Sequence, residues 1–493
     1  MDIWRTGLLS ALACALAVPG SPATAAGTQG QSADAPSSSF DLADRMVIAA
    51  EINHVVKRYF GHWEGLPPDY NWDAQFAAYL KEALAAPDRR GFSLATMRLF
   101  ASLENGHSSF YDAVLDAAPT LPFHARPVEG KWAVTTSWIP ELSPGDVITA
   151  IDGVPVDQWL TPIRAIVAQS DARAKNRVLL LQGRTLWPQR VRLSLASGKS
   201  VNIDRTATQG ERRPASKPFE VETKVRPDGV VVIRIPSFND PKFEAAAVAA
   251  VKAHKGAPLI LFDVRGNGGG STPGTLLEAI MDRPYAGTIV NTPMTIAQND
   301  AQASFSSDAA PLRLMVRYGP DRSQPAADAI KGPMAVLMDG GCGSACEDFV
   351  IRFQSGQRGP LVGEASFGST GQPYFVQWPQ WNMSIRVSTK REYLPDGRPF
   401  EGVGVTPDIA VPQLIADLGA AGDPQLERAL AALRSAASAR SSCGSPAAPR
   451  SAINCGTAMS GVTPTPSNGR PSGRYSRLVD TRIDMFHCGH WTK

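Results

Sequence analysis

Short runs of apolar residues recur in the second half of the chain, and glycine-rich sequence follows them. The runs at 258–264 (PLILFDV) and 334–338 (MAVLM) contain almost no polar position, which is typical of strands buried on both faces of a sheet. The stretch that begins at 346 (CEDFVIRF) has the spacing of an amphipathic helix. Strands alternating with helices predict a mixed α/β core over 217–437, closed by a helix at 423–437.

The first half of the chain follows two other patterns. Apolar residues at helical spacing over 41–60 and 72–86, separated by a Pro-Pro pair, predict an N-terminal helical segment over 38–115. Residues 142–156 (LSPGDVITAIDGVPV) alternate apolar and polar positions around an Asp-Gly turn. With similar runs at 191–195 and 200–206, they predict an inserted β-domain over 118–208.

Both ends of the chain differ from the folded part. Residues 1–26 combine Arg5, an apolar stretch and an Ala-Thr-Ala pattern, which predicts a cleavable signal peptide. No later apolar run reaches the roughly 20 residues that cross a membrane. We therefore expect a periplasmic or secreted protein without a transmembrane span. The Ser/Pro/Gly-rich stretch at 438–493 is expected to be a disordered tail.

Composition narrows the function only slightly. The 493 residues are 43% hydrophobic and 19% charged, with a net charge of +3, which is ordinary for a globular protein and argues against a nucleic-acid partner. His487 and His490 could bind a metal, but no second pair of ligands stands at a suitable spacing. We predict no metal site and no cofactor.

Two loops carry candidate chemistry. Residues 340–347 (GGCGSACE) join a predicted strand to a predicted helix and leave Ser344 at the helix N-terminus, where backbone amides can stabilise an oxyanion. The plainer interpretation is a helix N-cap. Residues 265–271 (RGNGGGS) follow the other strand. They lack the Gly-Lys-Ser/Thr of a phosphate loop and the glycine phasing of a dinucleotide site, so an oxyanion loop fits better.

Four motifs occur in order: DVRGNGGG at 263–270, SACE at 344–347, YLPDG at 393–397 and EGVGVTPDI at 401–409. Together they resemble the serine peptidases that include the C-terminal processing (tail-specific) proteases and the tricorn core, over residues 40–433. The resemblance implies a ClpP/crotonase-like mixed α/β fold. It implies attack by Ser344 and an oxyanion hole of the Ala345 amide with that of Gly269 or Gly268. The β-domain resembles PDZ domains, which bind peptide ends by strand addition.

The resemblance offers two catalytic designs. The processing proteases pair their serine with a lysine about 25 residues downstream, where this chain has Ser369. The tricorn-like branch instead uses a histidine and a glutamate, and LENGHS at 103–108 with Glu401 matches it. An alcohol nucleophile needs a base of near-neutral pKa and a carboxylate that orients it. The set implied is Ser344, His107 and Glu401. The role of a serine that supports the glutamate is unassigned, because Gly106 stands at its expected place.

Other histidines, at 54, 62, 124 and 254, have no such motif and are taken as structural. Removing the signal peptide leaves five cysteines. Cys342 and Cys346 flank Ser344 and could form a disulfide after export, although the turn between them could hold the sulfurs apart. Cys443 and Cys455 are an alternative pair, and Cys488 is left over.

The sequence thus predicts an exported serine endopeptidase that acts on extended or unfolded polypeptides. One alternative is a cysteine protease that uses Cys342 or Cys346. Another is a non-catalytic peptide- or lipid-binding protein on the same fold. Oligomeric state, including a homo-oligomer, stays open.

Overall fold

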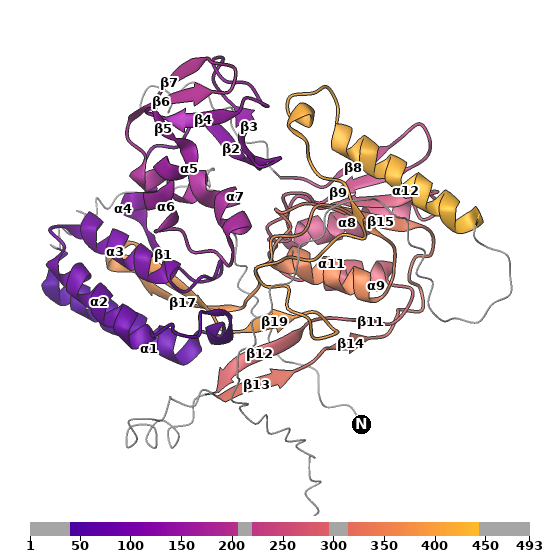
Figure 1. Cartoon of the computed structure of the whole chain (residues 1–493). Helices are drawn as coiled ribbons and strands as arrows, with labels where there is room; N and C mark the ends of the chain where they lie inside the picture. The colour runs from indigo at the N-terminus through magenta and orange to yellow at the C-terminus, as the bar shows by residue number, and fades with distance from the viewer. Residues whose placement is uncertain (1–39, 206–218, 295–313, 443–493) are drawn as a thin grey trace, which may run out of the picture. The chain divides into compact units, whose positions relative to one another are not determined.

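The computed structural model describes residues 40–205, 219–294 and 314–442 (Figure 1). The predicted signal peptide lies outside these residues, and so does the predicted tail beyond residue 442. So do Cys443, Cys455, Cys488 and the His487–His490 pair. Residues 438–442, predicted as the start of the tail, instead continue the last helix of the described residues, α12 (Pro424–Ser442). In the described ranges, no helix has the length and apolar character that a membrane crossing requires.

A six-stranded sheet forms the centre of the predicted α/β core, and its strand order is β20-β16-β15-β10-β9-β8. The predicted strands at 258–264 and 334–338 are neighbours in it and run parallel. All neighbouring pairs are parallel except β8 and β9, which are antiparallel. The prediction of a mixed α/β core is confirmed. The strands are β8 (Glu222–Val225), β9 (Val231–Arg234), β10 (Ile260–Asp263), β15 (Met334–Met338), β16 (Leu361–Gly363) and β20 (Ile409–Ala410).

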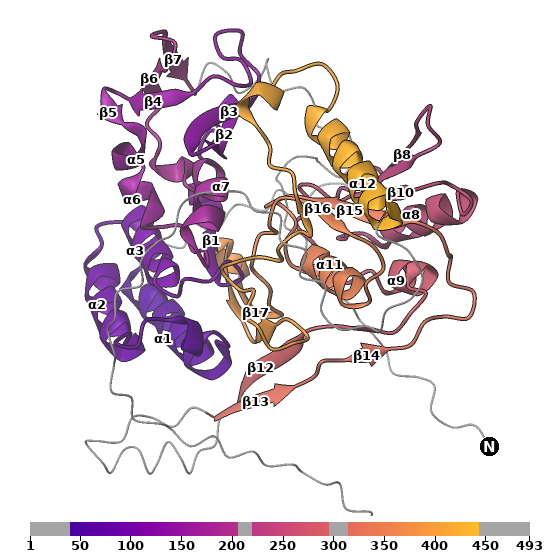
Figure 2. The same cartoon turned by 45° about the vertical axis from the view of Figure 1, so that its right-hand side comes forward.

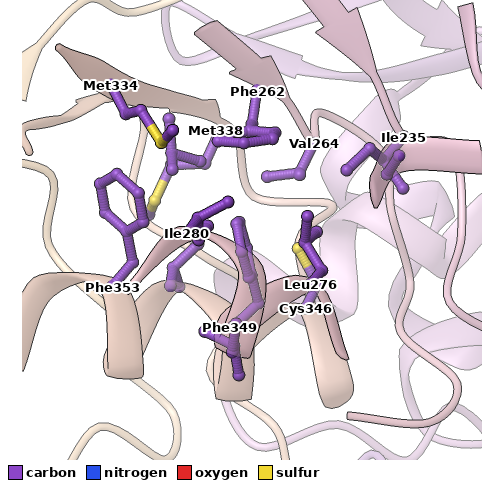
Figure 3. Close-up of a cluster of buried hydrophobic side chains, with 14 of the residues drawn as sticks. Ile235, Phe262, Val264, Leu276, Ile280, Met334, Met338, Cys346, Phe349 and Phe353 are labelled. Atoms are coloured by element: carbon purple, nitrogen blue, oxygen red, sulfur yellow. The ribbon is translucent and has the colours of Figure 1, made fainter. Parts of the chain in front are cut away.

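Helices cover both faces of this sheet because successive side chains of a strand point to opposite faces. In β15, Met334 and Met338 pack with Phe349 and Phe353 of α11, as Figure 3 shows. Leu337 packs on the other face, with α12, and Figure 2 shows α11 and α12 on opposite sides of β15. The core helices are α8 (Pro241–Ala253), α9 (Gly274–Ile280), α11 (Ala345–Ser355) and α12 (Pro424–Ser442).

The N-terminal helices share a core with strands from far along the chain. The helices α1 (Leu42–Tyr59), α2 (Trp72–Ala85) and α3 (Arg89–Ala101) are capped by the side chains of Asp41, Asn71 and Asp88, which accept from free backbone amides. Their buried faces pack on a sheet ordered β1-β18-β17. Its strands are β1 (Ser109–Asp112), β17 (Pro373–Trp378) and β18 (Met383–Ser388).

The inserted β-domain has its own buried core. Its β4–β5 hairpin turns at Asp152 and Gly153, whose φ angles of 50° and 79° suit an Asp-Gly turn. That this β-domain binds chain ends as PDZ domains do remains a prediction. Its strands are β2 (Phe123–Val128), β3 (Lys131–Ser137), β4 (Ile148–Ile151), β5 (Val154–Pro155), β6 (Arg190–Leu195) and β7 (Ser200–Asp204), and its helices include α5 (Val156–Trp159), α6 (Thr161–Arg164) and α7 (Ala172–Gln182).

A further antiparallel sheet is ordered β13-β12-β19, and it contacts the N-terminal segment where Asn291 of β12 donates to Glu64 Oε1 at 3.1 Å. Nearby, Gly61 donates its N–H to the carbonyl of Ser388, the last residue of β18, 2.9 Å away. The remaining short elements are α4 (Ala113–Asp116), β11 (Tyr285–Ala286), β12 (Ile289–Met294), β13 (Leu314–Tyr318), β14 (Arg322–Ser323) and β19 (Arg391–Tyr393).

Candidate active site

Ser344 occupies a strained turn between β15 and α11. Its φ of 54° and ψ of −124° lie in a region that a residue with a side chain rarely adopts, at a cost of about 1–3 kcal/mol. Such strain is found where a strand-to-helix turn presents a nucleophile. The residue is only partly buried, although both of its neighbours are buried. The turn therefore presents the hydroxyl rather than packing it away.

The glycine loop after β10 lies directly against this turn. A Cβ at Gly269 would lie 2.8 Å from the Ser344 Cβ and 2.8 Å from the Ala345 nitrogen, so the approach requires glycine. The Gly269 N–H donates to Asn267 Oδ1 at 2.9 Å. The N–H groups of Ala345 and Gly268 have no acceptor within the described ranges. Two unused donors thus remain beside Ser344.

Glu347 fixes the loops around the nucleophile from inside α11. Its carboxylate accepts from the Ser344 N–H at 3.1 Å and from the Ser366 hydroxyl at 2.5 Å. It also accepts from the N–H groups of Gly368 and Ser369, at 2.6 and 3.1 Å. The side chain is fully buried, and burial raises the pKa of Glu347 to about 7 against the effect of these donors. Sequence reasoning gave this residue no role, because burial of a motif glutamate cannot be read from the motif.

His107 lies in the turn that follows α3. Its N–H donates to Asn105 Oδ1 at 3.0 Å, and its ring Nδ1 lies 3.0 Å from Ser369 Oγ. Burial lowers the pKa of His107 well below its usual value, and the cationic Arg386 lowers it further. The ring is therefore a neutral imidazole. When Nδ1–H donates to Ser369, the lone pair is on Nε2, which is the form a general base requires.

Glu401 lies on the far side of Asn105. Its Oε2 accepts from the N–H and hydroxyl of Thr370 at 3.1 and 3.2 Å. Its Oε1 accepts from Asn105 Nδ2 at 3.4 Å and from Ser170 Oγ, which precedes α7 of the β-domain, at 3.3 Å. Burial raises the pKa of Glu401 to about 8. Asn105 thus contacts both His107 and Glu401, a link that local sequence did not reveal.

The three residues predicted as catalytic are brought to one region but are not hydrogen-bonded in series. In the part of the chain that the structure describes, no hydrogen bond joins the His107 ring to Ser344 or to Glu401. Ser369, which sequence analysis named only as the residue in place of lysine, is the partner of the ring. The spacing of 25 residues from Ser344 was the available signal for it.

A large cleft opens beside the glycine loop. Its volume is about 630 Å³, and Gly266, Gly268 and Gly269 form part of its wall. The rest of the wall is mostly apolar, with Arg386 close to His107. The apolar lining comes from the N-terminal segment and the β-domain: Met97, Phe100, Phe110, Leu115, Ile166, Val178 and Leu181.

Cys342 and Cys346 form a disulfide in the structure. Their Cα atoms are 5.3 Å apart, a usual separation for a disulfide, so the pairing considered from the sequence is present and the turn does not hold the sulfurs apart. Both residues are fully buried. The alternative of a cysteine nucleophile at either position is contradicted, because a bonded sulfur has no thiolate to attack with. Within the described residues, no cluster of three His, Cys, Asp or Glu suits a metal ion.

Comparisons with known proteins agree with this architecture. Residues 229–411 match the model of peptidase family S41. The chain is 35% identical over 81 residues to a carboxy-terminal-processing protease of Bartonella bacilliformis, covering 16% of this chain and 18% of that protein. It is 25% identical over 302 residues to a tail-specific protease of Haemophilus influenzae, covering 59% and 39%. The chain thus spans less than half the length of either relative.

The fold is similar to that of mature CPAF, whose crystal structure aligns with a TM-score of 0.63 at 14% identity. The alignment covers 82% of this chain and 99% of that structure. At 14% identity, this similarity supports the fold alone.

Proposed function

We propose, from the premise that residues 229–411 belong to peptidase family S41, that the protein is a serine-type peptidase. The observation that carries the proposal is the strained Ser344 turn beside two unused backbone donors. The names of the relatives describe tail-specific and carboxy-terminal-processing proteases. We infer that the substrates of this protein are extended or unfolded polypeptides.

In the proposed reaction, Ser344 Oγ attacks the scissile carbonyl carbon and its proton passes to His107 Nε2. The amides of Ala345 and Gly268 stabilise the resulting oxyanion. We prefer Gly268 to Gly269, because the Gly269 N–H already donates to Asn267. His107 then protonates the leaving amine, and water repeats the sequence to release the acyl group.

The histidine design is supported by the surroundings of Lys390, the first lysine after Ser344 in the sequence. Lys390 Nζ pairs with Glu392 Oε1 at 2.7 Å. Burial alone would lower the pKa of Lys390, but the Glu392 carboxylate raises it above its usual value. A cation held in this way is a poor general base. Ser369 meanwhile holds His107 Nδ1, so the position that carries lysine in the other design serves the histidine here.

Catalysis requires one adjustment of this geometry. Since the Ser344 hydroxyl is not hydrogen-bonded to His107 within the described residues, the turn at 103–108 must approach Ser344 when substrate binds. Catalytic hydrogen bonds often tighten only in the complex. We infer that a peptide bound in the 630 Å³ cleft draws the turn at 103–108 toward the glycine loop. Gly106 of the turn and Gly268 of the glycine loop both line this cleft.

We also propose that the protein is exported by its signal peptide, and that the β-domain captures chain ends by strand addition. The contact of Ser170 with Glu401 supports a β-domain that adjoins the catalytic residues.

The test is hydrolysis of one extended peptide with a free or an amidated C-terminus. We expect cleavage of both, seen as fragments by mass spectrometry, with a KM several-fold lower for the free end. Equal KM values would contradict capture of chain ends. Binding of the peptide without any fragments would contradict the peptidase function and favour the non-catalytic binder.

A further inference from the structure

A disulfide bridges the two ends of the turn that carries Ser344. It joins Cys342, which precedes Ser344 in the chain, to Cys346 in the first turn of α11. Both cysteine side chains are 0% exposed and belong to the core between α11 and the sheet. Figure 3 shows Cys346 in this core with Leu276 and Phe349. None of the proposed catalytic steps uses this bond.

The bridged turn contacts the loops on either side of it through its backbone. The Gly343 N–H donates to the carbonyl of Asn267 in the glycine loop at 3.1 Å. The Ser344 N–H donates to the Ser369 carbonyl, also at 3.1 Å, and Ser369 is the partner of the His107 ring. A displacement of this turn would therefore reach the glycine loop and the histidine as well as the nucleophile.

The backbone on the Cys342 side of the turn has little free space in which to shift. A Cβ at Gly341 would lie 2.8 Å from the Gly266 Cα. A Cβ at Gly343 would lie 3.2 Å from the Phe367 Cβ. Both neighbouring loops are thus already in contact with this part of the turn, so they must move when it moves.

Breaking the disulfide would displace this turn. Two unbonded sulfur atoms cannot stay within bonding distance, so the side chains of Cys342 and Cys346 must separate inside a close-packed core. Cys346 belongs to α11, whose Phe349 and Phe353 are fully buried in that core, so the displacement falls on the Cys342 side. The positive φ of Ser344 persists only while its surroundings over-determine it. Loss of this restraint therefore lets the turn relax and move the hydroxyl away from its present position.

We propose that the Cys342–Cys346 disulfide is a positioning element that holds Ser344 in its strained conformation, so that peptidase activity requires the bond. Neither cysteine touches the substrate. The bond forms when an oxidant that carries a disulfide exchanges with the two thiols, and the oxidant leaves as a dithiol with the two protons and two electrons. A dithiol reductant reverses this exchange. The inference rests on the proposed function and, together with the proposed export, confines activity to an oxidising compartment.

The test compares the oxidised and reduced forms of one protein. In a Cys443→Ser/Cys455→Ser/Cys488→Ser background, Cys342 and Cys346 are the only cysteines beyond the predicted signal peptide. This protein is unfolded and then refolded with either dithiothreitol or oxidised glutathione, and alkylation followed by mass spectrometry counts its free thiols. We expect the reduced form to have kcat and the rate of fluorophosphonate labelling lowered about tenfold or more, with KM unchanged. Reoxidation should restore both rates, because the sequence is the same.

A matched variant removes the bond permanently. Cys342→Ala/Cys346→Ala should be as slow as the reduced form and should stay slow in oxidised glutathione. Activity of this variant equal to that of the oxidised protein would contradict the inference.

A stabilising role alone would lower the midpoint of denaturant unfolding and leave kcat unchanged under folding conditions, and that result would overturn the inference. A loss confined to KM would overturn it as well. Circular dichroism checks folding. Failure of both the reduced protein and the double alanine variant to fold would assign the bond to folding instead of to positioning, which also overturns the inference. Absence of cleavage and labelling in the oxidised wild-type protein would instead overturn the proposed function.

Discussion

Replacing His107 with alanine is expected to lower kcat/KM for a peptide by a factor on the order of 10³ or more. The reason is that the proposed reaction passes the proton of the Ser344 hydroxyl to His107, whereas Lys390 is held as a cation by Glu392. Steady-state hydrolysis of one peptide by both proteins measures the loss. His254→Ala is the matched control, because that ring lies at the end of α8 and bonds only the Ala250 carbonyl in the described chain.

Lys390→Ala distinguishes the two catalytic designs. It should leave kcat/KM within a few-fold of the wild type, although it removes the partner of the buried Glu392 and should lower stability. The opposite pattern, with loss in Lys390→Ala and retention in His107→Ala, would restore a serine–lysine mechanism. The same comparison would then assign Ser369 a structural role only.

Replacing Glu347 with glutamine is expected to lower both activity and stability. The glutamine keeps one acceptor oxygen but turns an NH₂ group toward donors that the carboxylate now satisfies, among them the Gly368 N–H. Each buried donor left without a partner costs about 1–3 kcal/mol. We expect kcat/KM to fall on the order of 10²-fold, since Ser344 and Ser369 both lose their support. Glu278→Gln, at an exposed position of α9, should change neither quantity.

The stability loss should also depend on pH in a defined direction. The pKa of Glu347 is raised from 4.5 to about 7, so between these values the folded protein keeps a proton that the unfolded chain has lost. That contribution is complete below pH 4.5 and disappears as pH rises through about 7. The glutamine does not titrate, so the stability gap between the two proteins should narrow over this range by at most about 1.4 kcal/mol per pH unit. Denaturant unfolding at several pH values measures this stability gap. A gap that widens as pH rises would contradict a raised pKa at Glu347.

Local sequence was enough to predict the centre of the catalytic core. The apolar runs that became β10 and β15 are buried on both faces, and a buried strand followed by glycines is visible in a short window of residues. The position of Ser344 at the start of a helix could be predicted for the same reason. Its positive φ could not, because strain depends on the loops that hold the turn.

The surroundings of His107 and Glu401 could not be predicted from local patterns. The strand β1 pairs with β18, so Ser109 lies opposite Arg386, and this long-range pairing helps to bring the turn at 103–108 to the loops around Ser344. His62 was taken as structural because nothing near it in sequence is unusual. Its polar neighbours in the fold, Ser388 and Glu401, are more than 300 residues away in the sequence.

The most direct test of the central claim is covalent labelling of the wild-type protein with a fluorophosphonate, followed by peptide mapping in a mass spectrometer. A serine activated by a neutral base reacts with such a probe, and ordinary serines do not. We predict one adduct, on Ser344, that is lost in Ser344→Ala together with peptide turnover. An adduct on a different serine, or unchanged turnover in Ser344→Ala, would contradict the claim that Ser344 is the nucleophile.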